Sequence, residues 1–244
     1  MARRRLTACL RVSMPHSIGE ELSFWDVWGM EDHKKVYEYS IEGEIEPGQC
    51  VTIDNTATLV GIDDKSDEYN AEVCAGADLV IDKVAFYNFD RTYDWNIFKT
   101  GSEKQYLEAS TEAVPYSVDY TVTVEAAGYE DHDTQFGGTI TVSNPSEWNT
   151  VTATNVIDEP SFEGVTCDVN LDGVDLTFTP GEEKTFTYTC DGMTDQHGED
   201  ISSGTNTATV EWDAEAAHTV NGSVSSTIDV DPTLEADHHE VVTV

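Results

Sequence analysis

The stretch "GTNTATVEWD" at residues 204–213 decides the fold, and a near copy, "DNTATLVGID" at residues 54–63, lies a domain's length upstream. Side chains alternate between two faces in the downstream copy, which is the period of a β-strand. One face carries Asn206, Ala208, Val210 and Trp212. A strand repeated at this spacing predicts an array of domains, in which each copy closes a β-sandwich.

Strand patterns dominate the rest of the chain. "YSVDYTVTVE" places Tyr116, Val118, Tyr120, Val122 and Val124 on one face, which predicts a half-buried strand. "GTITVSNP" and "TFTYTC" alternate in the same way, through Ile140 and Val142 and through Phe186, Tyr188 and Cys190. The predicted fold class is therefore all-β, with the strands packed as β-sandwich repeats.

The spacing of the two copies divides the chain. Residues 36–74 are interpreted as the end of one repeat, residues 75–215 as a complete repeat, and residues 216–244 as the truncated start of a third. Residues 1–35 stay unassigned and are either non-native or disordered. The ends of the chain lead us to expect a fragment of a longer protein.

The charge is strongly acidic. The chain of 244 residues has 48 Asp and Glu against 12 Lys and Arg, a formal net charge of −36. Nucleic acids and anionic membranes both require basic surfaces, so neither is expected as a partner. An acidic surface suits a protein that works in high salt, where screening suppresses self-repulsion, although an ordinary acidic secreted protein is the alternative. We therefore expect a halophilic source.

Three motifs, in order, resemble the tandem Ig-like repeats of large prokaryotic cell-surface proteins and adhesins. The matching residues are Asp78, Leu79, Ile81 and Lys83, then Tyr93, Trp95, Ile97 and Lys99, then Asn206, Thr207 and Ala208. The resemblance covers roughly residues 37–232 and implies an Ig-like fold and a structural or adhesive role at the cell surface. It also implies neighbouring repeats of the same protein, surface glycans or other surface proteins as partners.

No signal peptide is recognised at the start of the chain, because its apolar run is too short. No apolar stretch is long enough to span a bilayer, so membrane insertion of this segment is not expected. An extracellular location therefore requires an export signal outside this segment.

The cysteines fit an oxidising setting. Cys50 and Cys74 flank the upstream copy, and Cys167 and Cys190 precede the downstream one, while Cys9 is left over. Four cysteines allow three connectivities, of which we prefer the two local bridges; free thiols in a reducing compartment are the alternative. The spacing supports neither a zinc ribbon nor a thioredoxin-like motif.

A weak calcium motif lies in "DVNLDGVDLTFT". Asp168, Asn170 and Asp172 match the first half of a calcium-binding loop, but Thr179 stands where a bidentate Glu belongs. An acidic turn is the alternative that we favour. Otherwise no cofactor or metal is expected.

The sequence contains no recognisable catalytic motif, so we do not expect an enzyme. The alternative function is a carbohydrate-binding module of a secreted protein, which requires exposed aromatic rings. Trp95 and Trp212 lie on apolar strand faces and are predicted to be core residues. Trp148 is then the best candidate for contact with a sugar.

Lys83 and Asn206 are both predicted to face the core, although a buried ammonium is costly without a partner. One resolution is an intramolecular isopeptide bond between them, resembling the cross-links of some other surface-adhesin Ig-like domains, in which a carboxylic acid assists. The simpler resolution, which we favour from the sequence, has Lys83 reaching the rim and Asn206 bonding a turn. Asp119 and Glu125 lie on the polar face of their strand, so no inward-facing acid is assigned.

Overall fold

The structure is a computed structural model that describes residues 6–12, 37–43, 45–58, 66–102, 104, 106, 111–113, 115–197 and 201–244. Across these residues every regular element is a strand and none is a helix, so the predicted all-β class is confirmed. Within them the chain also lacks any helical segment of the length and hydrophobicity needed to cross a lipid bilayer.

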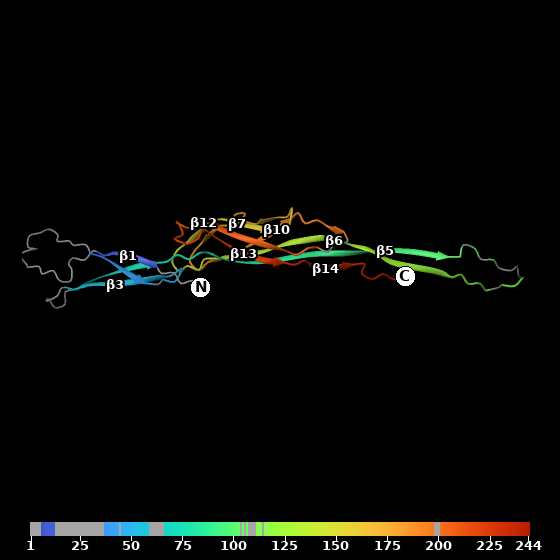
Figure 1. The fold of residues 1–244 in the computed structure, drawn as a ribbon, viewed down its shortest axis with the longest axis horizontal. Helices are drawn as coiled ribbons and strands as arrows, with labels where there is room; N and C mark the ends of the chain where they lie inside the picture. The colour runs from blue at the N-terminus through green and yellow to red at the C-terminus, as the bar shows by residue number, and fades with distance from the viewer. Residues whose placement is uncertain are drawn as a thin grey trace, which may run out of the picture.

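Two larger sheets form the centre of the molecule (Figure 1). The first has the order β14 (Thr233–His238), β5 (Val80–Gly101), β6 (Tyr120–Ser143), β10 (Glu183–Asp191) and β8 (Thr166–Val169), with β11 (Gln196–His197) also paired to β6. The second has the order β13 (Ser223–Val230), β12 (Gly204–Trp212), β7 (Val151–Pro160) and β9 (Thr177–Phe178). Neighbouring strands are antiparallel, except that β14 runs parallel to β5.

One hydrophobic core lies between the two sheets, in a sandwich-like arrangement. It includes Leu79, Ile140, Val142, Val151, Phe178, Phe186, Ala208, Val210 and Trp212. The inward face predicted for residues 204–213 is confirmed, because Asn206, Ala208, Val210 and Trp212 are all buried in β12. Alternate apolar side chains of β10 are buried in the same way. Burial of these faces is the main force that holds the sheets together.

Two hairpins lie at one side of the sandwich (Figure 1). They pair β1 (Leu6–Val12) with β2 (Tyr37–Gly43), and β3 (Cys50–Thr58) with β4 (Ser66–Cys74). The upstream copy of the opening motif lies in β3, whose Asn55 is half-buried. Within the described residues β3 pairs with β4 alone, so a sandwich closed by this copy stays a prediction. β12 itself lies inside its sheet, between β13 and β7.

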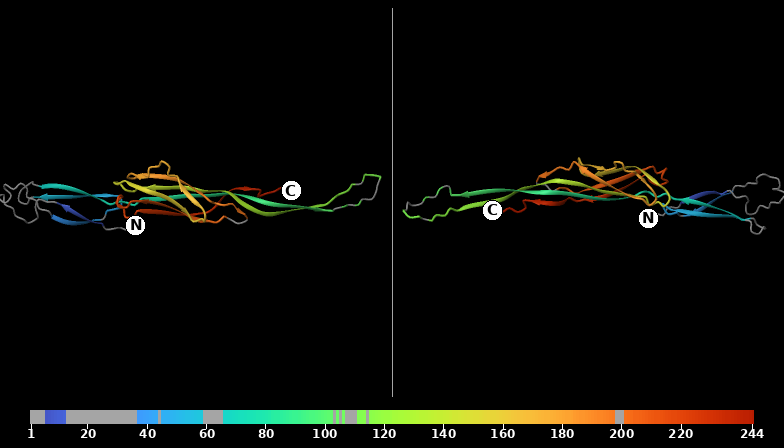
Figure 2. Two further views of the ribbon diagram at one scale, coloured as in Figure 1. Left: turned by 90° about the horizontal axis from the view of Figure 1, so that it is seen from above. Right: turned by 180° about the vertical axis from the view of Figure 1, so that it is seen from behind.

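The far halves of β5 and β6 project beyond the sandwich as an arm, which we define as residues 94–101 paired with residues 120–128 (Figure 2). The strand predicted at residues 116–125 begins only at Tyr120, and the prediction that it is half-buried is wrong for most of its length: Tyr116, Tyr120 and Val122 are exposed, whereas Val124 is half-buried. The reason is that no second sheet covers the arm in the part of the chain that the structure describes.

Both strands from the predicted third repeat join the central sheets. β13 pairs with β12, and β14 pairs with β5. The division at residues 75–215 and 216–244 therefore crosses hydrogen-bonded strands, and the repeat boundaries stay a prediction.

Candidate functional site

A lysine lies in the sandwich core. Strand β5 turns alternate side chains inward from Leu79 onward, and Lys83 falls on this inward face with only 4% of its surface exposed. Its Nζ forms an ion pair with Asp158 of β7, which belongs to the opposite sheet. Burial lowers the pKa of the Lys83 ammonium, and the hydrogen bond and charge of Asp158 oppose that shift. The predicted escape of Lys83 to the rim is therefore wrong.

Asp158 uses both carboxylate oxygens in this contact. Oδ1 accepts from Nζ of Lys83, and Oδ2 accepts from Nδ2 of Asn206 at 2.9 Å. The carboxylate is buried, with a side-chain exposure of 0%. Asp158 is therefore an inward-facing acid beside Lys83, and the sequence pattern alone does not reveal it.

A bulge in β7 places Asp158 on the inward face, where regular alternation from Val151 would not put it. In the pairing of β7 with β12, Trp212 lies opposite Ala153 while Glu211 lies opposite Asn155, so Thr154 is an extra residue. An extra residue reverses which side chains face inward. Inward positions therefore change from Val151 and Ala153 to Val156 and Asp158.

Asn206 is fully buried in β12. Besides its bond to Asp158, Nδ2 donates to the hydroxyl of Tyr188 at 3.3 Å. Among the described residues, no group donates to its Oδ1, which is also buried. Both hydrogen bonds of Nδ2 go to side chains of strands β7 and β10, so the predicted hydrogen bond of Asn206 to a turn is wrong. The unpaired carbonyl oxygen is costly in a core.

Tyr188 closes the site from β10. Its ring centroid lies 3.7 Å from Nζ of Lys83, in a cation–π contact, and its hydroxyl donates to the carbonyl of Val84 at 3.3 Å. Burial, followed by the charge of Asp158, raises the pKa of the Tyr188 phenol. A Cβ at Gly138 would lie 2.8 Å from the Tyr188 hydroxyl and 2.0 Å from the Val84 oxygen, so only glycine fits there.

Both preferred disulfides are present: Cys50 pairs with Cys74, and Cys167 pairs with Cys190. Each joins residues directly opposite one another, in β3 and β4 and in β8 and β10. In the described residues, two groups have donor atoms close enough for a metal, Cys50 with Glu72 and Cys74, and Asp158 with Cys167 and Cys190. A disulfide removes the thiolates that such a site needs, so neither group is a metal site in the oxidised protein.

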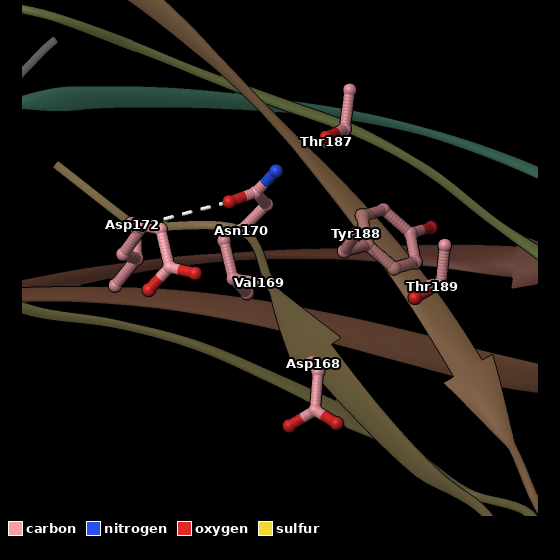
Figure 3. Close-up of a pocket in the computed structure, with 8 residues that line it drawn as sticks. Asp168, Val169, Asn170, Asp172, Thr187, Tyr188 and Thr189 are labelled. Atoms are coloured by element: carbon pink, nitrogen blue, oxygen red, sulfur yellow. Dashed lines mark hydrogen bonds between the residues drawn. The ribbon is translucent and has the colours of Figure 1, made fainter. Parts of the chain in front are cut away.

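The three calcium candidates line a shallow cavity of about 410 Å³ beside Tyr188 (Figure 3). Asp168 and Asp172 are exposed and their side chains lie apart, while Oδ1 of Asn170 accepts the backbone N–H of Asp172 at 3.4 Å. Asp168 is the outward residue of β8, because Cys167 and Val169 face inward. The geometry is that of an acidic turn, and the three residues are not brought together as a cation cage.

A second, partly buried ion pair stabilises the sheet near the arm. Arg91 donates from Nε and Nη2 to the two oxygens of the fully buried Asp131, at 2.6 and 2.8 Å. Its guanidinium also lies 3.9 Å from the ring centroid of Tyr129. Burial, together with the charge of Asp131, raises the pKa of Tyr87 to about 12.

The tryptophans divide differently from the prediction. Trp212 is buried, as predicted, but Trp95 is 38% exposed on the arm, so its predicted core position is wrong. Trp148 is half-buried, and its indole N–H donates to the carbonyl of Ala75 at 2.9 Å. Of these three tryptophans, Trp95 is therefore the most exposed, and Trp148 is not.

Comparison with protein families, curated proteins and solved structures found no match for the chain.

Proposed function

We propose that this chain is a structural and adhesive segment of an extracellular surface protein, from an organism that lives in high salt. The observation that carries the proposal is the arm, in which two long paired strands leave the sandwich and present an uncovered apolar face. Such a shape extends reach and offers a contact surface, which are the requirements of a stalk or adhesin.

One side of the arm forms an apolar stripe, which we define as Trp95, Ile97, Tyr120, Val122 and Val124. Antiparallel pairing of Ile97 with Val124, Lys99 with Val122 and Gly101 with Tyr120 puts these side chains on a common face. Ile97 is 66% exposed and Tyr120 is 59% exposed. Lys99 lies on the same face, with its Nζ 4.2 Å from the ring centroid of Tyr120, so the face combines apolar surface with one cation. Exposed apolar surface of this kind is typical of a protein contact, and a neighbouring repeat or another surface protein is the partner that we propose.

Two further properties support the proposed setting: the disulfides support an oxidising compartment, and the charge supports high salt. The two disulfides require an oxidising compartment to form and persist. The net charge of −36 supports work in high salt, where counterions screen the repulsion between carboxylates.

Proteolysis of intact cells tests the location. Cells of the source organism are treated with a protease that does not enter them, and the released peptides are identified by mass spectrometry. We expect peptides of this chain without lysis, alongside an intracellular control protein that stays intact. Protection of the chain until the cells are lysed would refute the extracellular proposal.

Binding of the purified chain to the same cells tests the arm. We expect Ile97→Asp to weaken binding at least tenfold, because it places a charge within the apolar stripe. Thr123→Asp is the matched control, since Thr123 is exposed and lies on the opposite face, across from Phe98. Equal binding by both variants would exclude the stripe as the contact surface.

A carbohydrate-binding module is the second candidate, favoured by the exposed ring of Trp95. In that case, soluble glycans released from the cell surface would compete with binding, and Trp95→Ala would abolish it. Binding that is insensitive to glycans would leave protein contact as the explanation.

A further inference from the structure

We propose that Lys83 and Asn206 become joined by an intramolecular isopeptide bond, which the chain forms by itself with Asp158 as the proton carrier. The site is the buried cluster of Lys83, Asp158, Asn206 and Tyr188. The proposal does not depend on a surface location, because it concerns chemistry inside the sandwich.

The two reacting groups are held on one carboxylate. Nζ of Lys83 contacts Oδ1 of Asp158, and the carboxamide nitrogen of Asn206 lies 2.9 Å from Oδ2 of the same side chain. Lys83, Asp158 and Asn206 come from three strands in two sheets, and each residue is at most 5% exposed. Reactants fixed side by side in a packed core react far faster than the same groups in solution, because little orientational freedom is left to lose.

Burial of both charges favours transfer of a proton from Lys83 to Asp158. A buried ion pair loses the hydration of both ions, and burial already lowers the pKa of the Lys83 ammonium. Transfer of one proton from Nζ to Oδ1 of Asp158 leaves a neutral amine and a neutral carboxylic acid. The neutral amine has the free electron pair that a nucleophile needs.

The bond-forming step is a transamidation. The Nζ electron pair attacks Cγ of Asn206, and the new Cγ–Nζ bond replaces the Cγ–Nδ2 bond. Asp158 gives its proton to Nδ2, which leaves as ammonia, and takes the second proton released by Nζ. The products are one secondary amide, one ammonia and a neutral Asp158, so no oxidant or other reactant is required.

The product suits the site better than the reactants do. It removes the buried ammonium, and the new amide N–H is placed to donate to Asp158. Oδ1 of Asn206 has no donor among the described groups, so it makes no hydrogen bond that the reaction would have to break. The Tyr188 ring, 3.7 Å from Nζ, helps to exclude water that would otherwise compete as a nucleophile.

The bond would connect β5 of one sheet to β12 of the other. In chain order, β5 is the first strand of the two central sheets, and only β13 and β14 follow β12. A cross-link between β5 and β12 would therefore keep the two sheets together when the ends of the chain are pulled.

Mass spectrometry of the purified full chain tests the bond. After denaturation, reduction and alkylation, we expect an intact mass lower than the sequence mass by one ammonia. Digestion should then yield a branched peptide in which the segments that contain Lys83 and Asn206 are joined. Separate peptides with unmodified Lys83 and Asn206 would overturn the proposal.

Succinimide formation at Asn221-Gly222 would also release ammonia, so the position of the loss matters. A loss confined to the single peptide that contains Asn221 would overturn the proposal. Lys83→Arg separates the two reactions, because it abolishes an isopeptide bond and leaves a succinimide unaffected.

Two further variants complete the test, each compared with its own sequence mass. Lys99→Arg is the matched control, since Lys99 is an exposed lysine of the same strand, and it should keep the loss of ammonia. Asp158→Asn should show the full sequence mass, and retention of the bond in this variant would overturn the role of Asp158. Where Asp158→Asn does not fold, the peptide map of the unaltered chain still decides the bond.

Discussion

Lys83 of β5 and Asp158 of β7 lie 75 residues apart in the sequence and form a buried ion pair that connects the two sheets of the sandwich. Each charge is tolerated in the core because the other is present. This mutual dependence makes the stability of the fold unusually sensitive to the loss of either partner alone.

Removal of the Asp158 carboxylate alone should lower the free energy of unfolding more than removal of both charges. Asp158→Ala leaves the Lys83 ammonium without its partner, and breaking a buried pair costs roughly 3 to 5 kcal/mol. The double variant Lys83→Met/Asp158→Leu replaces both groups by apolar side chains and should be clearly more stable than Asp158→Ala. Urea unfolding followed by tryptophan fluorescence measures the difference, and equal stability of the two variants would argue against a charge-based interaction.

The two disulfides should contribute differently to core stability. Their sequence separations of 24 and 23 are nearly equal, so the chain-entropy model gives each about 3.5 kcal/mol. Cys167 and Cys190 belong to the main core, whereas Cys50 and Cys74 join the hairpin of β3 and β4. We expect Cys167→Ala/Cys190→Ala to lower the unfolding midpoint reported by buried Trp212, and Cys50→Ala/Cys74→Ala to leave it nearly unchanged. A larger fall of the midpoint in Cys50→Ala/Cys74→Ala than in Cys167→Ala/Cys190→Ala would mean that the hairpin stabilises the sandwich.

Salt should stabilise the fold. The net charge of −36 makes the folded chain repel itself, and screening shortens the Debye length from about 10 Å at 0.1 M to about 3 Å at 1 M. Thermal melts should therefore show a midpoint that rises with NaCl into the molar range. A triple variant of exposed residues, Asp82→Asn/Glu183→Gln/Asp191→Asn, should show a weaker dependence. A midpoint independent of salt would remove the basis for a halophilic origin.

His132 should lose its stabilising effect as the pH rises. The hydrogen bond to Asp133 at 2.9 Å, assisted by the charges of Asp133, Asp90 and Glu130, raises the pKa of His132 above 6.5, while burial opposes the shift. The ring of His238 lies stacked on that of His132, with 6.1 Å between the ring centroids. Because the raised pKa belongs to the folded state, the stabilisation is complete below about pH 6.5 and declines as the pH passes the folded value.

An NMR titration of the imidazole signals checks the direction of this shift. The melting temperature measured across the same pH range should fall less steeply in His132→Gln than in the unaltered chain. A pKa for His132 at or below 6.5 would contradict the prediction.

Arg91→Lys should destabilise the sheet although the charge is kept. The guanidinium forms two hydrogen bonds to the buried Asp131, and an ammonium cannot reproduce this planar, paired geometry. We expect a loss of roughly 1 to 3 kcal/mol in urea unfolding. The exposed Lys99→Arg on the same strand serves as the control and should change stability little. An unaffected Arg91→Lys would show that the charge alone is enough.

The sequence by itself determined which side chains share a face. Because side chains of a strand alternate strictly, "TNTATVEW" predicted the buried face of Asn206, Ala208, Val210 and Trp212, and the inward position of Lys83 followed in the same way. Local spacing likewise favoured Cys50 with Cys74 and Cys167 with Cys190, since residues of nearby strands come to lie opposite one another.

Only the tertiary structure decided which faces are covered and which acid meets the lysine. Tyr120 and Val122 alternate as core residues do, yet they lie on the arm, and alternation cannot tell whether a second sheet packs over a face. Asp158 faces inward because the extra residue Thr154 reverses the alternation of β7, and a bulge depends on the pairing with β12 rather than on the local pattern. The pattern of one strand is local, whereas the partner of a buried charge is set by the packing of two sheets.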